Sequence, residues 1–544
     1  MNQFINRKEN LVTDAIDGVL EASGGKLARL DGYPHIKVVM RNDWDKSKVA
    51  LISGGGSGHE PSHAGFVGQG MLTAAICGDV FASPTVDAVL AGILAVTGKE
   101  GCLLIVKNYT GDRLNFGLAA ERARAFGIKV EVVVVDDDVA LPDLPQPRGV
   151  AGTLFVHKIA GAAAEAGKNL QSVASVARDV IDSVASIGMS LDTCTIPGSD
   201  KEDRIAPGMA ELGLGIHGEA GAQQVPFETA KTAMDMVLDK LVATLSTGTC
   251  VALINNLGST TPLEMSVLVN ELTASSKAEN VKFVIGPSAM MTSLDMHGFS
   301  VSVMPANEEW IEALSTKVTM AAWPGLIELH PVAVEPLPDG LSPIQPIPSE
   351  NVKVRAIIEH CCDLLADAED ELNELDAKSG DGDTGSTLAT AARALKSSLD
   401  RMPLADLTQL FRAVGNELSQ TMGGSSGVIL AIFFCASGDA CANGKTTSAA
   451  LMAGLERISQ VGGAGVGDRT MIDALKPALE ALPDGFDVAA VAARTGADNT
   501  SKIGRARAGR SAYVPEENLI GNNDPGAEAV ARLFEGMASW VKSV

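Results

Sequence analysis

The 544-residue sequence has few of the features that mark secreted, membrane-bound or nucleic-acid-binding proteins. Its eight cysteines include no C-x-x-C pair and most stand in apolar surroundings, so we expect buried thiols rather than disulfides or zinc. The 43 basic residues are outnumbered by 67 acidic ones, and the net charge of −24 argues against nucleic acid or an anionic membrane as partner. No signal-type apolar segment follows the N-terminus, and the most apolar run, Val428–Ala436, is too short to span a bilayer. We therefore expect a cytoplasmic protein.

The length exceeds that of a single hydrophobic core, so two or three domains are expected. Hydrophobic residues make up 46% and charged residues 20%, which is typical of a globular protein. Six prolines between residues 331 and 349 disfavour a helix and indicate an extended linker. The predicted division is a domain at 1–330, a linker at 331–349 and a domain at 350–544.

Residues 1 to about 330 alternate short apolar runs, which are typical of strands, with stretches of helical periodicity. The apolar runs are 36–40, 49–52, 103–106, 130–135, 251–254, 281–285 and 301–304. Helical periodicity covers 86–96 and 114–125. This alternation predicts an α/β domain, and the helix-rich gap between the two sets of runs predicts subdomains at about 1–190 and 191–330.

Strand signals disappear after the linker, and amphipathic helices take their place. Apolar residues at helical spacing mark a first helix from Val354 to Leu365 and a last one from Val530 to Val541. Glycine-rich loops separate further helical segments between them. The C-terminal domain is therefore predicted to be all-α.

The stretch 375–387 holds the carboxylates of Asp376, Asp381 and Asp383, with glycines between them and hydroxyls after them. Carboxylates this close repel one another unless a cation lies among them, and Mg²⁺ takes oxygen ligands while leaving positions for phosphates. Apolar residues at helical spacing follow, so residues 384–387 are predicted to begin a helix whose N–H groups could hold an anion. The pattern is that of a metal–phosphate site.

This stretch has two other interpretations. An EF-hand loop starting at Asp381 is excluded, because it would need an oxygen ligand, a glycine and a bidentate Glu where the sequence has Gly385, Ser386 and Ala392. A solvated acidic turn, where clusters of Asp and Gly usually occur, stays open on the residues alone.

Three polar stretches in the predicted α/β domain are candidate site segments. His59 lies in the glycine-rich stretch 53–61, taken as a loop after a strand, which lacks the lysine of a P-loop and the spacing of G-x-G-x-x-G. Lys107 and Asp112 follow another strand-like run, at the edge where α/β sites form. His217 stands in a glycine-flanked turn. Separately, each has an ordinary alternative, a solvated or capping histidine or an N-cap aspartate.

Together these stretches are far more specific. In chain order the sequence contains GGGSGHEPSHAGFVG, GDVFASP, IVKNYTGDRLNFGLA, GLGIHGE, the proline-rich segment, DAKSGDGDTGST, GGSSG, GDRTMID and DPGA. Over essentially its whole length it resembles the dihydroxyacetone kinases, in particular the single-chain form that uses ATP. The resemblance implies a glycerone kinase with a barrel-like helical nucleotide domain. It also implies a homodimer in which the ATP domain of one subunit faces the substrate domain of the other.

In the α/β domain the resemblance implies that an imidazole nitrogen of His217 adds to the carbonyl carbon of dihydroxyacetone and forms a covalent hemiaminal. Glycerol, which has no carbonyl, would be excluded. Asp112 would be the general base on the attacking hydroxyl, with His59 assisting proton transfer. The residues that would contact the substrate hydroxyls are Gly56, Ser57, Gly58, His59, Lys107 and Asp112.

In the C-terminal domain the resemblance implies that Asp376, Asp381 and Asp383 hold two Mg²⁺ ions that bind the phosphates of ATP. The domain has no Walker-type lysine, so charge neutralisation falls mostly to the metals. The residues that would bind ATP are Thr384, Gly385, Ser386, Thr387, Ser425, Ser426, Gly462, Met471, Arg510, Asp524, Pro525 and Gly526. On the residues alone, the turn at 423–427 equally fits a helix start capped by serine.

Three other functions fit parts of the sequence. A relative that uses a phosphotransferase carrier has its two halves on separate chains, whereas this chain carries both. A triokinase acting on D-glyceraldehyde, or an FMN cyclase acting on FAD, is excluded by no residue. A non-enzymatic sensor could lose a catalytic carboxylate or a metal ligand, yet Asp112, His217 and the three aspartates are all present.

Overall fold

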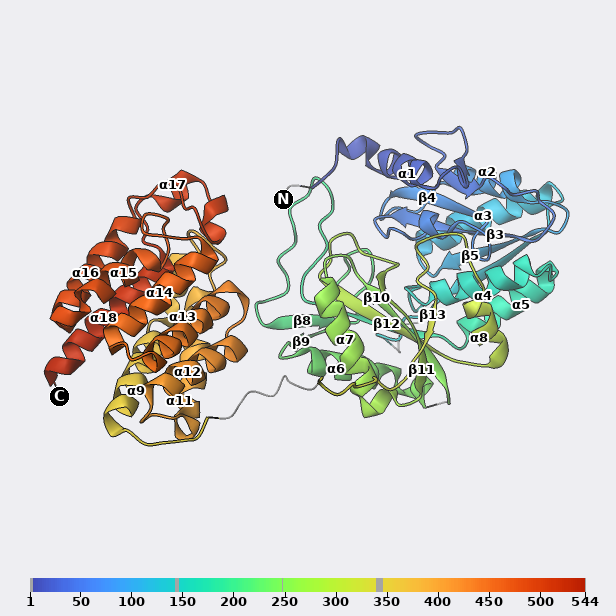
Figure 1. The fold of residues 1–544 in the computed structure, drawn as a ribbon. Helices are drawn as coiled ribbons and strands as arrows, with labels where there is room; N and C mark the ends of the chain where they lie inside the picture. The colour runs from blue at the N-terminus through green and yellow to red at the C-terminus, as the bar shows by residue number, and fades with distance from the viewer. Residues whose placement is uncertain (1–2, 142–145, 247, 339–345, 544) are drawn as a thin grey trace. The chain divides into compact units, whose positions relative to one another are not determined.

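The computed structural model describes residues 3–141, 146–246, 248–338 and 346–543, without the side chains of Ser425 and Arg510. The chain forms two compact units, Met1–Ala333 and Val334–Val544, each considered by itself (Figure 1). Of the expected linker 331–349, residues 339–345 lie outside the described part. Within the described ranges, no helix has the length and apolar character needed to cross a membrane.

The first unit contains two β-sheets, and the first has the strand order β1-β2-β4-β3-β5-β6. Its β4, β3, β5 and β6 run parallel, while β1 and β2 pair antiparallel. The strands are β1 (Leu27–Arg29), β2 (Val38–Arg41), β3 (Ala50–Ser57), β4 (Ala74–Val80), β5 (Cys102–Lys107) and β6 (Val130–Val135). The helices of this part are α1 (Leu11–Ala22), α2 (Val86–Val96), α3 (Thr110–Ala125), α4 (Thr153–Glu165) and α5 (Leu170–Ile181).

The second sheet has the order β13-β11-β10-β12-β7-β8-β9, with β10 and β11 parallel and the other neighbours antiparallel. Its strands are β7 (Ala185–Ser190), β8 (Met209–Leu212), β9 (Gln223–Pro226), β10 (Cys250–Asn256), β11 (Val281–Ala289), β12 (Gly298–Pro305) and β13 (Leu326–Glu328). Its helices are α6 (Ala230–Leu245), α7 (Pro262–Ala274) and α8 (Glu308–Ser315). The predicted α/β class of this part is confirmed.

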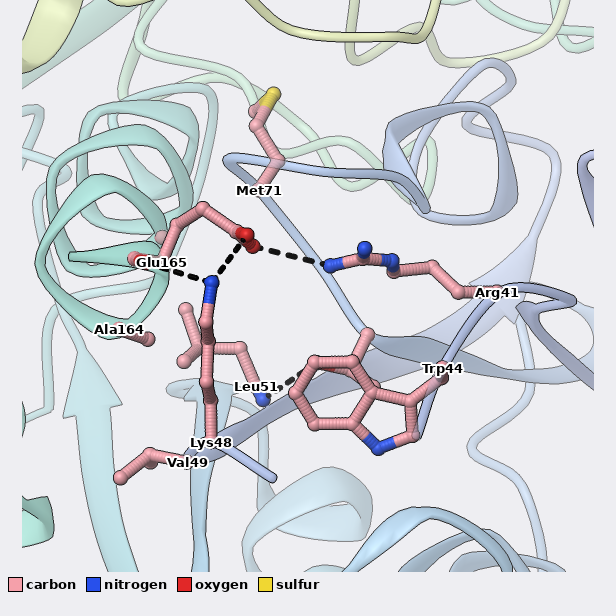
Figure 2. A pocket seen from close by; sticks show the side chains of 10 residues that line it. Arg41, Trp44, Lys48, Val49, Leu51, Met71, Ala164 and Glu165 are labelled. Carbon is pink, nitrogen blue, oxygen red and sulfur yellow. Dashed lines mark hydrogen bonds and ion pairs between the residues drawn. The ribbon is translucent and has the colours of Figure 1, made fainter. Parts of the chain in front are cut away.

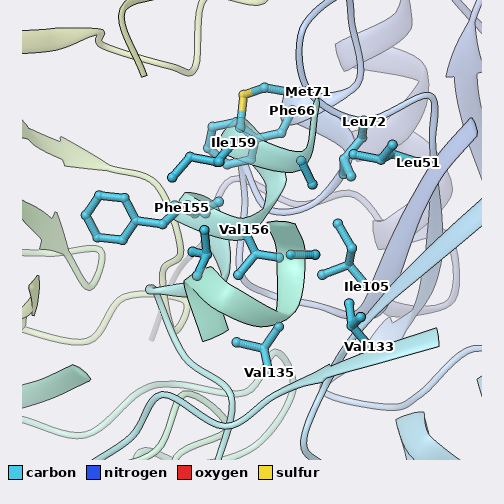
Figure 3. Packing of buried hydrophobic residues seen from close by; sticks show 14 of the residues in the cluster. Leu51, Phe66, Met71, Leu72, Ile105, Val133, Val135, Phe155, Val156 and Ile159 are labelled. Carbon is cyan, nitrogen blue, oxygen red and sulfur yellow. The ribbon is translucent and has the colours of Figure 1, made fainter. Parts of the chain in front are cut away.

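Helix α4 is central to the largest hydrophobic core cluster. Its Phe155, Val156 and Ile159 belong to the same buried cluster as Leu51 of β3 and Ile105 of β5, and Phe155 points away from these two residues (Figure 3). The same cluster takes in buried residues of β10 from the second sheet. A shared, close-packed core fixes the two sheets relative to each other, so loops from both can form one rigid site.

Of the glycine-rich stretch 53–61 predicted to be a loop, residues 53–57 form the second half of β3, so this part of the prediction is wrong, while residues 58–61 follow the strand. The strand continues because its glycines let other backbone segments come close. A Cβ on Gly54 would stand 2.2 Å from the carbonyl oxygen of Ile76, and one on Gly56 would stand 2.7 Å from the backbone nitrogen of Ala82. No other residue fits there, so glycine carries β3 up to the residues predicted to bind substrate.

The second unit is helical, as predicted. Its α-helices are α9 (Val352–Asp367), α10 (Glu369–Asp376), α11 (Thr384–Ser398), α12 (Leu407–Thr421), α13 (Gly424–Ala442), α14 (Thr447–Gly462), α15 (Ile472–Ala481), α16 (Phe486–Thr500), α17 (Glu516–Leu519) and α18 (Pro525–Ser543). Contacts run from α9 through α11, α12, α13, α14, α15 and α16 to α18, which packs back on α9. The helices therefore close a ring.

Candidate active site

In the first unit, aromatic side chains from three separate segments surround the ring of His217. The ring centroid of Tyr109 lies 4.3 Å from that of His217, that of His59 lies 4.9 Å away and that of Phe81 lies 5.5 Å away. His59 follows β3, Tyr109 precedes α3, and His217 lies between β8 and β9. The structure thus brings together the two histidines that the sequence places far apart.

Glu219 fixes the orientation of His217. Its Oε2 accepts the backbone N–H of His217 at 2.9 Å, and its Oε1 lies 3.3 Å from the Nδ1 of the ring. Burial raises the pKa of Glu219, but the hydrogen bonds from the ring and the backbone N–H of His217 outweigh this and lower the pKa to about 2. An ionised carboxylate only accepts hydrogen bonds, so it holds the proton on Nδ1 and leaves a lone pair on Nε2. That nitrogen is suited to nucleophilic attack.

The tautomer of His59 follows from its partner. Its Nδ1 lies 2.8 Å from the carbonyl oxygen of Thr292, and because a carbonyl only accepts, Nδ1 carries the proton. Burial, together with the charge of Lys107, lowers the pKa of His59 well below its usual value, so the ring is neutral. Its Nε2 is buried and has no hydrogen-bond partner among the described residues. This nitrogen is therefore a free acceptor.

Lys107, the last residue of β5, and Asp112, in the first turn of α3, are buried. Lys107 Nζ and Asp112 Oδ1 each lack a hydrogen-bond partner within the described part of the chain. Burial lowers the pKa of Lys107, an effect that the charge of Asp112 opposes. Buried polar groups are nearly always hydrogen-bonded, so unpaired ones point to a ligand or to water.

The sequence predicts Asp112 as an N-cap if it has only a structural role. Tyr109 occupies that position instead, and Asp112 lies inside the helix. Its carboxylate is therefore free of the ordinary capping role, which strengthens its case as a functional group.

Another cluster of charges in the first unit behaves differently, as Figure 2 shows. The Oε1 of Glu165 accepts from Lys48 Nζ at 2.6 Å, and its Oε2 accepts from Arg41 Nη1 at 3.1 Å. Arg41 also donates to both carboxylate oxygens of Asp43. The cavity beside them measures only about 10 Å³. Charges paired in this way have a structural role. Lys107 Nζ and Asp112 Oδ1 have no such partner among the described residues, which makes their surroundings the better candidate for a binding site.

The predicted contacts at Gly56, Ser57 and Gly58 lie on the end of β3 and just after it. The hydroxyl of Ser57 donates to the carbonyl of Gly78 at 2.8 Å, so it stabilises the strand. A Cβ on Gly58 would stand 2.8 Å from the ring of Phe81. These residues shape the wall beside His59, and their contacts with a substrate stay predictions.

The sequence analysis missed three residues at this site. Glu219 orients His217, and Tyr109 packs against the His217 ring with a buried hydroxyl that has no described partner. Ser83 also has a buried, unpartnered hydroxyl, and its Cβ would lie 3.2 Å from a Cβ on Gly111, next to Asp112. All three stand inside the sequence strings that carry the family resemblance, but nothing in their spacing distinguishes them from scaffold residues.

In the second unit, Asp376, Asp381 and Asp383 come together, with one oxygen of each within 4.8 Å of the others. Asp376, the buried last residue of α10, accepts through Oδ2 the backbone N–H groups of Gly382, Asp383 and Thr384 at 3.0 to 3.2 Å. These bonds fold the stretch back on Asp376 just before α11, and they bring the exposed carboxylates of Asp381 and Asp383 near that of Asp376. A donor set made only of carboxylate oxygens fits a hard cation such as Mg²⁺.

The predicted phosphate-binding residues begin α11 at Thr384, and Thr387 lies in its first turn. The side chain of Asn373 in α10 holds Ser386. The Ser386 hydroxyl accepts from Asn373 Nδ2 at 2.9 Å, and the Ser386 backbone N–H donates to Asn373 Oδ1 at 3.0 Å. A Cβ on Gly385 would stand 2.0 Å from the carbonyl oxygen of Glu369. Gly385 and Ser386 therefore dock the start of α11 on α10.

Three of the predicted nucleotide residues meet at another helix start. A Cβ on Gly526 would lie 3.3 Å from the Cβ of Met471 and 3.2 Å from Asp524 Oδ1. Asp524 accepts the N–H of Ala527 and precedes Pro525, the first residue of α18. Burial raises the pKa of Asp524 to about 6.

The remaining predicted nucleotide residues lie elsewhere in the helical unit. Ser426 is in the first turn of α13, and Gly462 is the last residue of α14. The side chains of Ser425 and Arg510 lie outside the described part. Just after Arg510, the hydroxyl of Ser511 donates to the carbonyl of Ser379 at 3.1 Å, which brings this segment to the aspartate stretch.

An α/β unit with unpaired polar groups around a histidine, followed by a helical unit with an aspartate cluster, matches two domain families. The Dak1 domain matches residues 17–322, and the DAK2 domain matches residues 378–539. The chain belongs to the dihydroxyacetone kinase family.

Individual relatives agree with this assignment. The sequence is 48% identical over 543 residues to dihydroxyacetone kinase of Citrobacter freundii, covering 98% of each chain. It is 37% identical to triokinase/FMN cyclase of Homo sapiens, covering 99% of each. The crystal structure of the C. freundii kinase in complex with AMP-PNP and Mg²⁺ matches with a TM-score of 0.69 and 46% identity over 99% of both chains. The family and the fold expected from the sequence are confirmed.

Proposed function

We propose that the protein is an ATP-dependent glycerone kinase, which transfers the γ-phosphoryl group of ATP to a terminal hydroxyl of dihydroxyacetone. The observation that carries this proposal is the arrangement around His217. Glu219 leaves Nε2 with its lone pair, while His59, Lys107 and Asp112 present buried polar atoms that have no hydrogen-bond partner among the residues the structure describes. Such a site suits a small molecule with one carbonyl and several hydroxyls. The match to the C. freundii kinase over the whole chain supports the same substrate.

His217 would hold the substrate covalently. Its Nε2 lone pair forms a bond to the carbonyl carbon, and the π electrons of the carbonyl move onto the oxygen. The imidazole releases its Nδ1 proton, which Glu219 and solvent relay to that oxygen, so that one proton moves from nitrogen to oxygen and the hemiaminal is neutral. Glycerol cannot react in this way because it has no carbonyl.

The other groups would orient and activate the acceptor hydroxyl. Lys107 donates to a substrate oxygen, and the free Nε2 of His59 accepts from a hydroxyl. As the terminal hydroxyl oxygen attacks the γ-phosphorus in line, its proton passes to Asp112 and ADP leaves. Burial keeps water away from these groups, which limits competing hydrolysis of ATP.

In the helical unit, Asp376, Asp381 and Asp383 would hold Mg²⁺, and two ions are expected. When bound, Mg²⁺ offsets the charge of the ATP phosphates. The first-turn N–H groups of α11 add favourable backbone dipoles for phosphate oxygens. The group formed by Met471, Asp524 and Gly526 would line the rest of the nucleotide. We further propose that the protein works in the cytoplasm and that it forms a homodimer. Light scattering on the purified protein measures its mass and so tests the homodimer.

The similarity to the human triokinase/FMN cyclase gives a second candidate activity, which should be tested in parallel. Because a triokinase/FMN cyclase aligns over 99% of both chains, D-glyceraldehyde as acceptor and FAD as a lyase substrate are the alternatives.

The deciding experiment measures ADP release from ATP and Mg²⁺ by the purified protein with dihydroxyacetone, D-glyceraldehyde or glycerol, and FMN release from FAD. We expect ADP release with dihydroxyacetone and none with glycerol, abolished in His217→Ala and in Asp381→Ala. His297→Ala is the matched control, because His297 pairs with Glu264 away from the site. No ADP release with any carbonyl compound, from folded protein that still binds Mg²⁺ and ATP, would overturn the proposal.

A further inference from the structure

Arg148 joins the segment between β6 and α4 to the turn that carries His217. Its Nε donates to Asp138 Oδ2 at 2.7 Å, and its Nη2 donates to the carbonyl oxygen of Gly213 at 2.8 Å. The side chain of Arg148 is only 15% exposed and that of Asp138 only 5%. Charge-assisted bonds in such a protected place are stronger than those at an exposed surface. The guanidinium is therefore held firmly beneath the His217 turn.

The guanidinium and the Glu219 carboxylate face each other at Gly215. A Cβ on Gly215 would stand 2.8 Å from Arg148 Nη1 and 2.2 Å from Glu219 Oε2. The same Oε2 accepts the backbone N–H of His217. The carboxylate that binds the His217 N–H thus lies near the guanidinium as well, without a hydrogen bond between Arg148 and Glu219, and Gly215 leaves the room for both groups.

We propose that Arg148 is a positioning residue that keeps His217 neutral and aimed at the carbonyl carbon, an inference that rests on the proposed hemiaminal chemistry. Glu219 orients the ring, but its negative charge also favours the imidazolium form, which has no lone pair to attack with. The positive charge of Arg148 offsets this effect. Glu219 can therefore orient the ring without protonating it.

The other titratable groups around the ring act in both directions. Lys107 also disfavours a second positive charge, whereas Asp112 and Asp138 favour one. His59 and Tyr109 are neutral, because burial lowers the pKa of His59 and raises that of Tyr109. Two arginines are hydrogen-bonded to the His217 turn, Arg148 at the Gly213 carbonyl and Arg204 at the Glu219 carbonyl, which accepts from Arg204 Nη2 at 3.3 Å. Arg204 donates to both carboxylate oxygens of Glu211, whereas Arg148 Nη1 approaches the Glu219 carboxylate at Gly215, so removal of Arg148 changes the balance at the ring more directly.

The test observes the adduct rather than the kinase reaction. The full-length protein is mixed with dihydroxyacetone labelled with carbon-13 at its carbonyl, and the fraction converted from ketone to hemiaminal carbon is measured by NMR from pH 5 to pH 9. In Arg148→Met we expect about tenfold less adduct near neutral pH, and we expect the amount of adduct to recover as the pH rises. The fall of adduct on the acidic side of the pH profile should move up by about one pH unit. Arg148→Lys keeps the charge and should keep the wild-type limb. Arg178→Met, at an exposed ion pair with Glu131, is the matched control.

Each outcome decides. A wild-type pH profile in Arg148→Met overturns the inference, and so does an equal loss of adduct at every pH, because that shows only a collapsed turn. Should Arg148→Met fail to fold, Arg148→Gln keeps a donor for the Gly213 carbonyl without the charge, and the same shift is expected. Absence of adduct in the wild-type protein contradicts the proposed function itself rather than the role of Arg148.

Discussion

Lys107 and Asp112 lie against the same side of Gly55, with Lys107 Nζ and Asp112 Oδ2 each 3.5 Å from the place where a Cβ on that glycine would stand. Both side chains are buried, and Lys107 Nζ and Asp112 Oδ1 have no hydrogen-bond partner in the described ranges. Opposite charges held close but not bonded leave room for a third group. A hydroxyl can accept from the ammonium and donate to the carboxylate at once, so under the proposed function this pair would bind the acceptor hydroxyl of the substrate.

Asp112→Asn keeps the shape of the side chain and removes the base. We expect kcat to fall about 10²- to 10⁴-fold, because a positioned general base contributes that much. The hemiaminal on His217 should still form, since its chemistry does not use Asp112. Steady-state kinetics and NMR of the labelled ketone measure the two effects. Asp87→Asn, at an exposed ion pair with Arg122, is the control, and a kcat within twofold of wild type in Asp112→Asn would rule out this role.

Gly215→Ala tests the hold of Glu219 on His217. The added methyl would stand 2.2 Å from Glu219 Oε2, so the carboxylate must move away from the His217 N–H. We expect loss of most of the adduct and at least a tenfold fall in kcat/KM, which corresponds to about 1.4 kcal/mol of lost transition-state stabilisation. Gly117→Ala in α3 is the control, because no atom lies within 4 Å of its Cβ position. Wild-type adduct formation in Gly215→Ala would show that Glu219 does not orient the ring.

Much of the architecture could be predicted because it depends on local patterns. Helix α2 spans Val86–Val96, as its periodicity predicts, and the three aspartates gather because they stand within eight residues of one another. The course of β3 was not predictable, since glycine usually signals a loop. Only the close approach of Ile76 and Ala82, far along the chain, explains why a strand of glycines forms here.

The supporting residues of the site could not be predicted for a similar reason. In the sequence, Glu219 cannot be told from an ordinary surface carboxylate. Its role depends on the turn that brings its side chain back to His217. Arg148 stands in a proline-rich stretch with no motif of its own, and its partners come from other strands and turns. Such residues are defined by tertiary contacts, which a single sequence does not display.

Asp383→Asn tests the metal site with little risk to the fold, because this side chain is exposed. We expect the Mg²⁺ concentration for half-maximal activity to rise about tenfold or more, with partial recovery at high Mg²⁺. Removing the metal with EDTA should abolish ADP release in every variant. Asp376→Asn should also destabilise the loop, because its Oδ2 accepts three backbone N–H groups. Asp370→Asn, an exposed carboxylate on the same helix α10, is the control, and an unchanged Mg²⁺ requirement in Asp383→Asn would contradict the assignment.

His63 and His157 form a buried pair in the first unit whose ring centroids are 5.3 Å apart. Their ring nitrogens have no hydrogen-bond partner among the described residues. Burial lowers the pKa of His157 to about 3 and that of His63 well below its usual value. Both rings are therefore neutral in the folded protein, and protonating either of them opposes folding.

This pair should make the protein sensitive to acid. An unfolded histidine has a pKa of about 6.5, so below that pH the unfolded state binds more protons than the folded state. The contribution of His157 is fully present above about pH 6.5 and is lost as the pH falls toward 3, by about 1.4 kcal/mol per pH unit, and His63 acts in the same direction. His157→Leu removes one such proton, so the free energy of unfolding should depend on pH less steeply by about that amount between pH 6 and pH 4. Urea unfolding followed by tryptophan fluorescence measures the slope, with exposed His35→Leu as the control. Identical slopes in His157→Leu and wild type would mean that His157 is not held neutral by the fold.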